Sequence, residues 1–203
     1  MLDQFIYGAP VCGVLLLAIV AISVSALSFA PQLIQNNLFR PYWMPRRNQY
    51  YTLVTSAFIH ADYGHLLFNA LTLWSFGVAL ERVIGSPRFF VLYVVGLLAS
   101  GFGTYFKQRK NPDYACLGAS GAILAVLFAS IVYFPTQSIY VLPLPVPIPA
   151  PLYAVGFLAY TWYAARNPRG RINHDAHMDG ALAGLAFVAL TDFGAYWRLW
   201  QLL

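Results

Sequence analysis

Residues 114–134 read Tyr-Ala-Cys-Leu-Gly-Ala-Ser-Gly-Ala-Ile-Leu-Ala-Val-Leu-Phe-Ala-Ser-Ile-Val-Tyr-Phe and contain no charged side chain. An apolar run of this length can form a membrane-crossing helix, which needs about 20 mainly apolar residues. Ser120 lies between Gly118-Ala119 and Gly121, where the strongly hydrophobic part begins. The stretch therefore predicts a membrane helix that starts with a hydroxyl group.

The composition of the whole chain points to the same environment. Hydrophobic residues make up 60% of the 203 residues, charged residues make up only 9%, and the mean hydropathy is +0.62. A soluble domain carries about 25% charged residues, so the composition argues against a soluble fold. The length is that of one domain, and we expect residues 1–203 to form a single membrane domain.

Stretches without a charged residue set the number of expected spans. The stretches 4–39, 63–80 and 89–106 each hold one helix. The stretch 114–165 holds two, because Pro135 and the proline-rich connector Pro143–Pro151 divide it. A sixth helix follows His174. We therefore expect an all-α, multi-pass bundle of six transmembrane helices, at about residues 10–30, 63–80, 89–106, 120–134, 150–165 and 176–196.

The net charge of +5 raises the question of a nucleic-acid partner. The basic residues instead form short clusters beside the expected spans, a pattern that favours contact with anionic membrane lipid. Cys12 and Cys116 are too far apart in sequence to indicate a disulfide framework or a metal cluster. The histidines lack HExxH spacing, so we expect no metal, no cofactor and no nucleic acid.

Two polar residues share one face of the second expected span. His65 and Asn69 are four residues apart, and both can donate hydrogen bonds to a developing oxyanion. The alternative is a structural polar pair that joins two helices.

A histidine also lies on a small-residue face of the sixth expected span. His177, Gly180 and Gly184 share that face by their offsets of three and seven, and small residues at such spacing let helices pack closely. The expected neighbour is the fourth span, through its small residues Gly121, Ala122 and Ala125. His177 could then act as the base that a serine nucleophile requires; the alternative for Gly118–Gly121 is a packing site.

Other polar residues near His177 are expected to lie elsewhere. Asp175 and Asp179 are each two residues from His177 and so point off its face. We expect them to meet solvent or Arg171, and we expect His174 at the surface or the membrane interface.

The second, fourth and sixth of six spans run in the same direction. His65, Ser120 and His177 each lie near the start of one of these helices. We therefore expect all three side chains at a similar depth, near one face of the membrane.

Together these motifs resemble the rhomboid family of intramembrane serine proteases, over about residues 60–190. The resemblance implies a six-helix bundle with a water-filled cavity open to one face, and it implies a Ser120–His177 dyad without an acidic third member. It also implies an oxyanion hole formed by His65, Asn69 and the Ser120 backbone, and substrates that are transmembrane proteins, entering near the second and fifth spans. The motifs that carry the resemblance are His60, His65 and Asn69; Glu81 with Gly85-Ser86; Gly118-Ala119-Ser120-Gly121; and Ala176-His177 with Gly180 and Gly184. The expected structural support comes from Gly118, Gly121, Gly180 and Gly184.

The chain departs from the family pattern at several positions. Tyr51 and Thr52 stand where a Trp-Arg pair is frequent, so the structuring role of that arginine is missing unless Arg46 or Arg47 replaces it. An aromatic residue commonly lies four residues after the serine and stacks on the histidine, but this chain has Leu124. Phe128 stands where the family frequently has a glycine.

The sidedness of the active site is open at the level of the sequence. The first, third and fifth loops hold nine of the 12 basic residues, and the positive-inside rule would place these loops in the cytoplasm. The family usually opens its site to the opposite side. We expect a bacterial inner membrane protein.

Two alternatives to a protease remain. One is an inactive rhomboid-like protein that binds or chaperones membrane proteins. The other is a small-solute channel or transporter, against which the lack of a repeat between halves argues. The sequence does not predict the oligomeric state.

Overall fold

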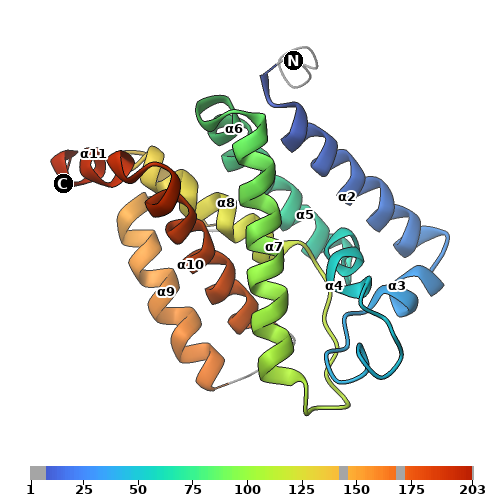
Figure 1. The fold of residues 1–203 in the computed structure, drawn as a ribbon. Coiled ribbons are helices and arrows are strands. Elements are labelled where there is room, and N and C mark those ends of the chain that lie inside the picture. The colour runs from blue at the N-terminus through green and yellow to red at the C-terminus, as the bar shows by residue number, and fades with distance from the viewer. Residues whose placement is uncertain (1–7, 142–145, 168–171, 203) are drawn as a thin grey trace.

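The computed structural model describes residues 8–141, 146–167 and 172–202. Helices dominate it, with α7 between α2 on one side and α9 and α10 on the other (Figure 1). The elements in chain order are α2 (Pro10–Ser28), α3 (Gln32–Asn37), α4 (Thr52–Thr55), η1 (Ser56–Phe58), α5 (Tyr63–Thr72), η2 (Leu73–Gly77), α6 (Val78–Ile84), α7 (Ser86–Gln108), α8 (Ser120–Tyr133), β1 (Ser138–Tyr140), β2 (Pro147–Pro149), α9 (Ala150–Arg166), α10 (His174–Thr191) and α11 (Phe193–Leu202).

Each predicted span coincides with a helical segment, and the all-α membrane fold is confirmed. By length and composition, three stretches of the described chain can cross a membrane alone: Pro10–Ser28, Tyr63–Ile84 and Ser86–Gln108. The bent pair α10–α11 is a fourth if it counts as one span. Helix α8 has only 14 residues, about 21 Å at 1.5 Å per residue, which is less than the roughly 30 Å of a hydrocarbon core.

The predicted sixth span, 176–196, covers parts of two helices, α10 and α11, rather than one. Helix α10 ends at Thr191, and the direction changes by 101° before α11. The break occurs at Asp192, whose carboxylate accepts hydrogen bonds from the Tyr133 hydroxyl at 3.1 Å and from Arg198 at 3.0 Å. A carboxylate is better placed at this polar junction than on the side of an apolar helix.

Helix α8 forms the centre of the bundle, with all residues from Gly121 to Val132 buried. Helix α10 packs on it through backbone contacts at two glycines. A Cβ atom on Gly180 would lie 2.1 Å from the carbonyl oxygen of Gly121, and one on Gly184 would lie 2.2 Å from that of Ala125. The small-residue face of α10 therefore lies against α8, the neighbour expected from the sequence.

A buried glutamate holds the start of α2. The Glu81 carboxylate accepts hydrogen bonds from the backbone N–H groups of Val11 at 3.0 Å and Cys12 at 2.7 Å, and from the Ser86 hydroxyl at 2.6 Å. The first N–H groups of a helix have no partner within the helix and carry partial positive charge, so a carboxylate satisfies both needs.

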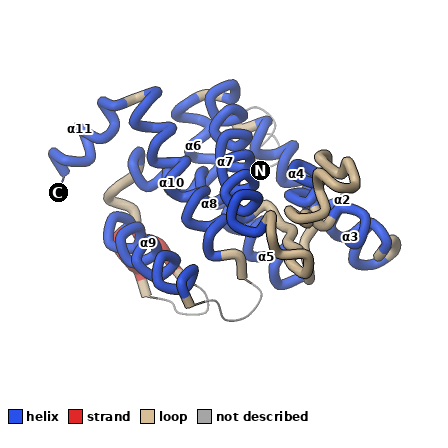
Figure 2. Tube along the Cα trace, turned by 60° about the horizontal axis from the view of Figure 1, so that its bottom comes forward, coloured by secondary structure: helices blue, strands red, loops and turns tan. Residues whose placement is uncertain are grey.

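Part of the proline-rich segment Pro143–Pro151, expected as an extended connector, is strand β2, which pairs with β1 just before that segment; Figure 2 shows the two strands beside α9. Strands β1 and β2 are antiparallel, with Ile139 opposite Ile148. Two of the three residues of β2 are prolines without a backbone N–H, which suits an edge strand. Residues 143–145 of the expected connector lie outside the described part of the chain.

Candidate active site

The structure brings Ser120 and His177 within hydrogen-bond distance. Ser120 is the first residue of α8, His177 lies in the first turn of α10, and His177 Nε2 is 2.9 Å from Ser120 Oγ. Gly121 follows Ser120, and Gly180 lies about one turn after His177. These two glycines allow the backbones of α8 and α10 to approach each other. Close helix packing and the polar contact therefore depend on the same glycines.

Gly118 shapes the loop that enters α8. Its φ of +116° is a conformation that residues with side chains rarely adopt. A Cβ atom there would lie 2.6 Å from Cε1 of His65. The Gly118 N–H donates to the Ser56 carbonyl at 2.9 Å. Glycine is thus required both for the turn and for the room that the His65 ring occupies.

The two residues predicted for the oxyanion hole lie on α5. Asp62 caps this helix by accepting from the His65 N–H at 2.7 Å, which fixes His65 in the first turn beside Gly118. The buried Asn69 side chain donates to the His65 carbonyl at 2.9 Å, leaving its second N–H for another acceptor. Their role in oxyanion binding stays a prediction.

His60, to which sequence analysis assigned no role, supports the loop before Ser120. The Ser23 hydroxyl donates to the Phe58 carbonyl at 3.0 Å and lies 3.0 Å from His60 Nδ1. Nδ1 must therefore carry the proton, which leaves Nε2 to accept from the Ala119 N–H at 3.4 Å. Burial, and secondarily the neighbouring His65, lower the pKa of His60 to about 3, so the ring stays neutral and able to accept.

The expectation for His174 was wrong. Its side chain is buried rather than at the surface. The ring makes edge-to-face contacts with Tyr160 of α9, at 5.5 Å between centroids, and with His177, at 6.2 Å. Burial follows because α9 covers the start of α10.

The two aspartates near His177 lie away from its ring, as expected. Asp175 forms an ion pair with Lys107 at the end of α7. The Asp179 carboxylate lies against Gly103, where a Cβ atom would clash with it. Among the described residues neither carboxylate hydrogen-bonds His177. Arg171 lies outside the described residues.

In the first loop, the residues that depart from the family pattern make contacts of their own. Thr52 is buried and its hydroxyl donates to the Gln49 carbonyl at 2.7 Å. In the same loop Arg46 lies over the Tyr42 ring at 3.8 Å and donates to the Tyr42 carbonyl at 2.6 Å. Arg46 therefore orders its own part of the loop.

On α8, the other two departures lie in the interior. Leu124 and Phe128 are both buried, and the Phe128 ring contacts Phe157 of α9 at 5.5 Å between centroids. The close packing of α10 on α8 is nevertheless kept at Gly184 and Ala125, as described above.

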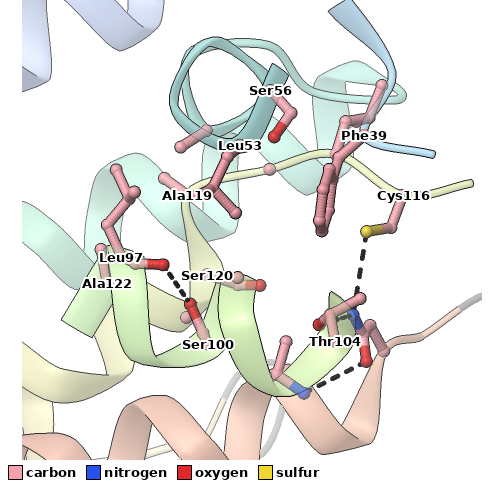
Figure 3. Close-up of a pocket in the computed structure, with 17 residues that line it drawn as sticks. Phe39, Leu53, Ser56, Leu97, Ser100, Thr104, Cys116, Ala119, Ser120 and Ala122 are labelled. Atoms are coloured by element: carbon pink, nitrogen blue, oxygen red, sulfur yellow. Dashed lines mark hydrogen bonds between the residues drawn. The ribbon is translucent and has the colours of Figure 1, made fainter. Parts of the chain in front are cut away.

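A cavity of about 50 Å³ lies beside Ser120 (Figure 3). It has room for more than one water molecule. Polar side chains contribute to its wall, and the Asn173 side chain links two of them by donating to Thr104 at 2.9 Å and to Cys116 Sγ at 3.8 Å. Its lining comprises Phe39, Leu53, Ser56, Ala57, Leu97, Ser100, Gly101, Thr104, Cys116, Leu117, Gly118, Ala119, Ser120, Gly121, Ala122, Asn173 and Ala176.

Within the described part of the chain, no three His, Cys, Asp or Glu side chains are grouped as ligands for a metal ion. The site residues brought together near Ser120 carry a hydroxyl (Ser120), imidazoles (His65 and His177) and an amide (Asn69).

A family model described as the Rhomboid domain matches residues 47–192. The chain belongs to the rhomboid family. The matched region of this rhomboid contains all of the predicted site residues, from His65 to Gly184.

Similar curated proteins come from mitochondria and from a bacterium. This rhomboid is 33% identical over 144 residues to Rhomboid protein 1, mitochondrial, of Saccharomyces cerevisiae, a match that covers 67% of this chain and 40% of that protein. It is 37% identical over 78 residues to Putative rhomboid protease YdcA of Bacillus subtilis, covering 38% of each chain. Rhomboid protease GluP of the same bacterium is 39% identical over 83 residues, which are 41% of this chain and 16% of GluP. The chain spans less than half the length of these relatives.

Proposed function

We propose that this rhomboid is an intramembrane serine endopeptidase that hydrolyses peptide bonds in or near the transmembrane segments of other membrane proteins. The observation that carries the proposal is the 2.9 Å contact between Ser120 Oγ and His177 Nε2. A serine hydroxyl is a weak nucleophile until a base within hydrogen-bond reach removes its proton. The names of two bacterial relatives, which call them proteases, support the same reading.

In the proposed reaction, His177 Nε2 takes the Ser120 proton as Oγ attacks the scissile carbonyl carbon. The carbonyl oxygen becomes an oxyanion, and His65, Asn69 and the Ser120 backbone N–H would donate hydrogen bonds to it. His177 then gives its proton to the leaving amine, which departs and leaves an acyl group on Ser120. Water, deprotonated by His177, hydrolyses this ester and restores the free serine.

Two structural features support this sequence of steps. Ser120 is the first residue of α8, so its N–H has no acceptor within the helix and the positive end of the helix dipole lies beside it. The cavity next to Ser120 offers polar partners for the water that deacylation consumes.

The expected substrate is a membrane protein whose helix unwinds locally. Carbonyl groups within a helix are already hydrogen-bonded, so attack requires an extended segment. The resemblance implies small residues at the cleaved bond. Entry between α5 and α9 corresponds to the route that the resemblance implies. The mitochondrial relatives do not support a bacterial inner membrane in particular, and we limit the proposal to an integral membrane site.

A cleavage assay tests the proposal. The purified protein in liposomes is mixed with a model transmembrane substrate, and the products are mapped by mass spectrometry. We expect cleavage by the wild type and by Ser130→Ala, which removes another buried hydroxyl of α8, but none by Ser120→Ala. A purely binding protein would instead retain the uncut substrate equally in the wild type and in Ser120→Ala.

The membrane side of the site can be measured separately. Arg109 is exposed just after α7, on the side of the bundle that holds Ser120. Labelling of Arg109→Cys by an impermeant thiol reagent in intact cells would favour the family orientation, and protection until lysis would favour the positive-inside orientation.

A further inference from the structure

The His177 ring has an aromatic neighbour that comes from α9. The centroids of the Phe157 and His177 rings are 6.5 Å apart and the planes are inclined by 27°, which is an offset-stacked arrangement. Phe157 is half-buried on the face of α9 that turns toward the bundle. It contacts His177 without belonging to either helix of the Ser120–His177 pair.

Packing has to orient the His177 ring in this site. In a serine–histidine–aspartate triad, a carboxylate holds the imidazole through the second ring nitrogen. Among the described residues, the only hydrogen bond of the His177 ring is that to Ser120. The ring can therefore rotate about its bond to Cβ unless neighbouring side chains block it.

Helix α8 does not supply the blocking ring. One turn after Ser120 it carries the aliphatic Leu124, and the next turn carries Phe128, whose ring contacts Phe157 at a tilt of 55° and has no ring contact with His177. The edge of His174 approaches His177 at 6.2 Å with its plane at 81°. Phe157 is thus the ring that lies nearly parallel to the imidazole.

Helix α9 is the least embedded of the helices around the site. Only Ala150, Thr161 and Ala164 of its 17 residues are buried. The Phe157 ring contacts Phe128 of α8, at 5.5 Å between centroids, and Tyr153, on the preceding turn of α9 itself, at 5.7 Å. Only the first of these contacts joins α9 to α8. The position of the Phe157 ring therefore depends on whether α9 is docked on α8.

We propose that Phe157 is a positioning residue that holds the His177 imidazole toward Ser120, and that it does so only while α9 is docked against the bundle. Displacement of α9 would withdraw the ring and release the imidazole. Docking of α9 and activation of Ser120 are then coupled through one side chain. This inference rests on the proposed function, because it concerns the base of that reaction.

The test uses a small fluorophosphonate, which reacts with an activated serine and does not need a helix to enter the bundle. We expect Phe157→Leu to lower the rate of Ser120 labelling about two- to tenfold, the loss that one aromatic contact corresponds to. Substrate cleavage should show the loss in kcat with little change in KM. Phe157→Tyr keeps the ring and should label at the wild-type rate.

Two further variants separate positioning from general packing. Tyr153→Leu removes a ring from the same helix and the same cluster but not from His177, and it should label nearly as the wild type does. Leu124→Phe offers a ring from α8 instead, and it should restore labelling in the Phe157→Leu background. If Phe157→Leu does not fold, Phe157→Met, which keeps the volume without a ring, takes its place.

The outcomes distinguish the two proposals. Equal labelling of Phe157→Leu and wild type, or an equal loss in Tyr153→Leu, would overturn the role of Phe157 while leaving the protease intact. Absence of labelling and cleavage in the wild type itself would overturn both.

Discussion

Substitution of Gly180 by alanine should separate Ser120 from His177 without touching either. The added Cβ would lie 2.1 Å from the Gly121 carbonyl oxygen and 3.0 Å from its Cα. Ordinary contact begins at 3.4 Å, so the helices must move apart by up to 3.4 minus 2.1, about 1.3 Å, because the opposing atoms are backbone and cannot rotate away. The 2.9 Å hydrogen bond would lengthen to about 4 Å, beyond the roughly 3.2 Å reach of a catalytic base.

A displacement of about 1 Å at a reacting centre can cost on the order of 100-fold in rate, and overpacking costs about 1–3 kcal/mol of stability. We therefore expect Gly180→Ala to lower kcat about 100-fold and to lower the thermal midpoint in detergent by a few degrees. Gly156→Ala, on the lipid-facing side of α9 with no atom within 4 Å of the new Cβ, is the matched control and should leave both unchanged. Activity of Gly180→Ala within twofold of wild type would refute the dependence of the dyad on close helix packing.

Three further changes have expected outcomes. Gly118→Ala forces a side chain into a φ of +116° and against His65 at 2.6 Å, so it should lower stability by about 1–3 kcal/mol and slow Ser120 labelling; an unchanged melting curve and rate would argue against this loop geometry. Glu81→Ala leaves two N–H groups of α2 without an acceptor and should cost about 1–3 kcal/mol in thermal unfolding with the cleavage-site pattern unchanged, whereas a wild-type midpoint would contradict the capping role. Burial raises the pKa of Cys116 to about 11, so maleimide labelling of this thiol should keep rising tenfold per pH unit from pH 8 to 10; labelling of Arg109→Cys should level off near pH 9, and a similar plateau for Cys116 would refute the shift.

The sequence was sufficient to predict the Ser120–His177 contact because its signals are local. The three- and seven-residue offsets of Gly180 and Gly184 put His177 on the packed face of its helix. Ser120 and His177 lie at the starts of the fourth and sixth expected spans. These spans run in the same direction, so both residues were expected near the same end of the two helices. Neither inference needed the position of a distant side chain.

Other features depend on partners far along the chain. At the break, Asp192 accepts a hydrogen bond from Tyr133 of α8, and an apolar run by itself gives no sign of this contact. The burial of His174 depends on Tyr160 of α9. The role of His60 requires Ser23, which precedes it by 37 residues.

Phe157 illustrates the same difficulty within a helix. Helix α9 is apolar on almost every side, as expected for a helix that meets lipid, so the sequence does not distinguish the face toward α8 from the face toward lipid. The missing ring at Leu124 was visible in the sequence, but the identity of its replacement requires the packing of α9 on α8.

The proposed activity is tested most directly by attaching a fluorophosphonate to the purified protein and locating the adduct by mass spectrometry. We expect the wild type to carry the adduct on Ser120, and we expect neither Ser120→Ala nor His177→Ala to be modified. Ser130→Ala should react as the wild type does. A wild-type protein that neither reacts nor cleaves a transmembrane substrate, or labelling that persists in Ser120→Ala, would contradict a serine protease mechanism.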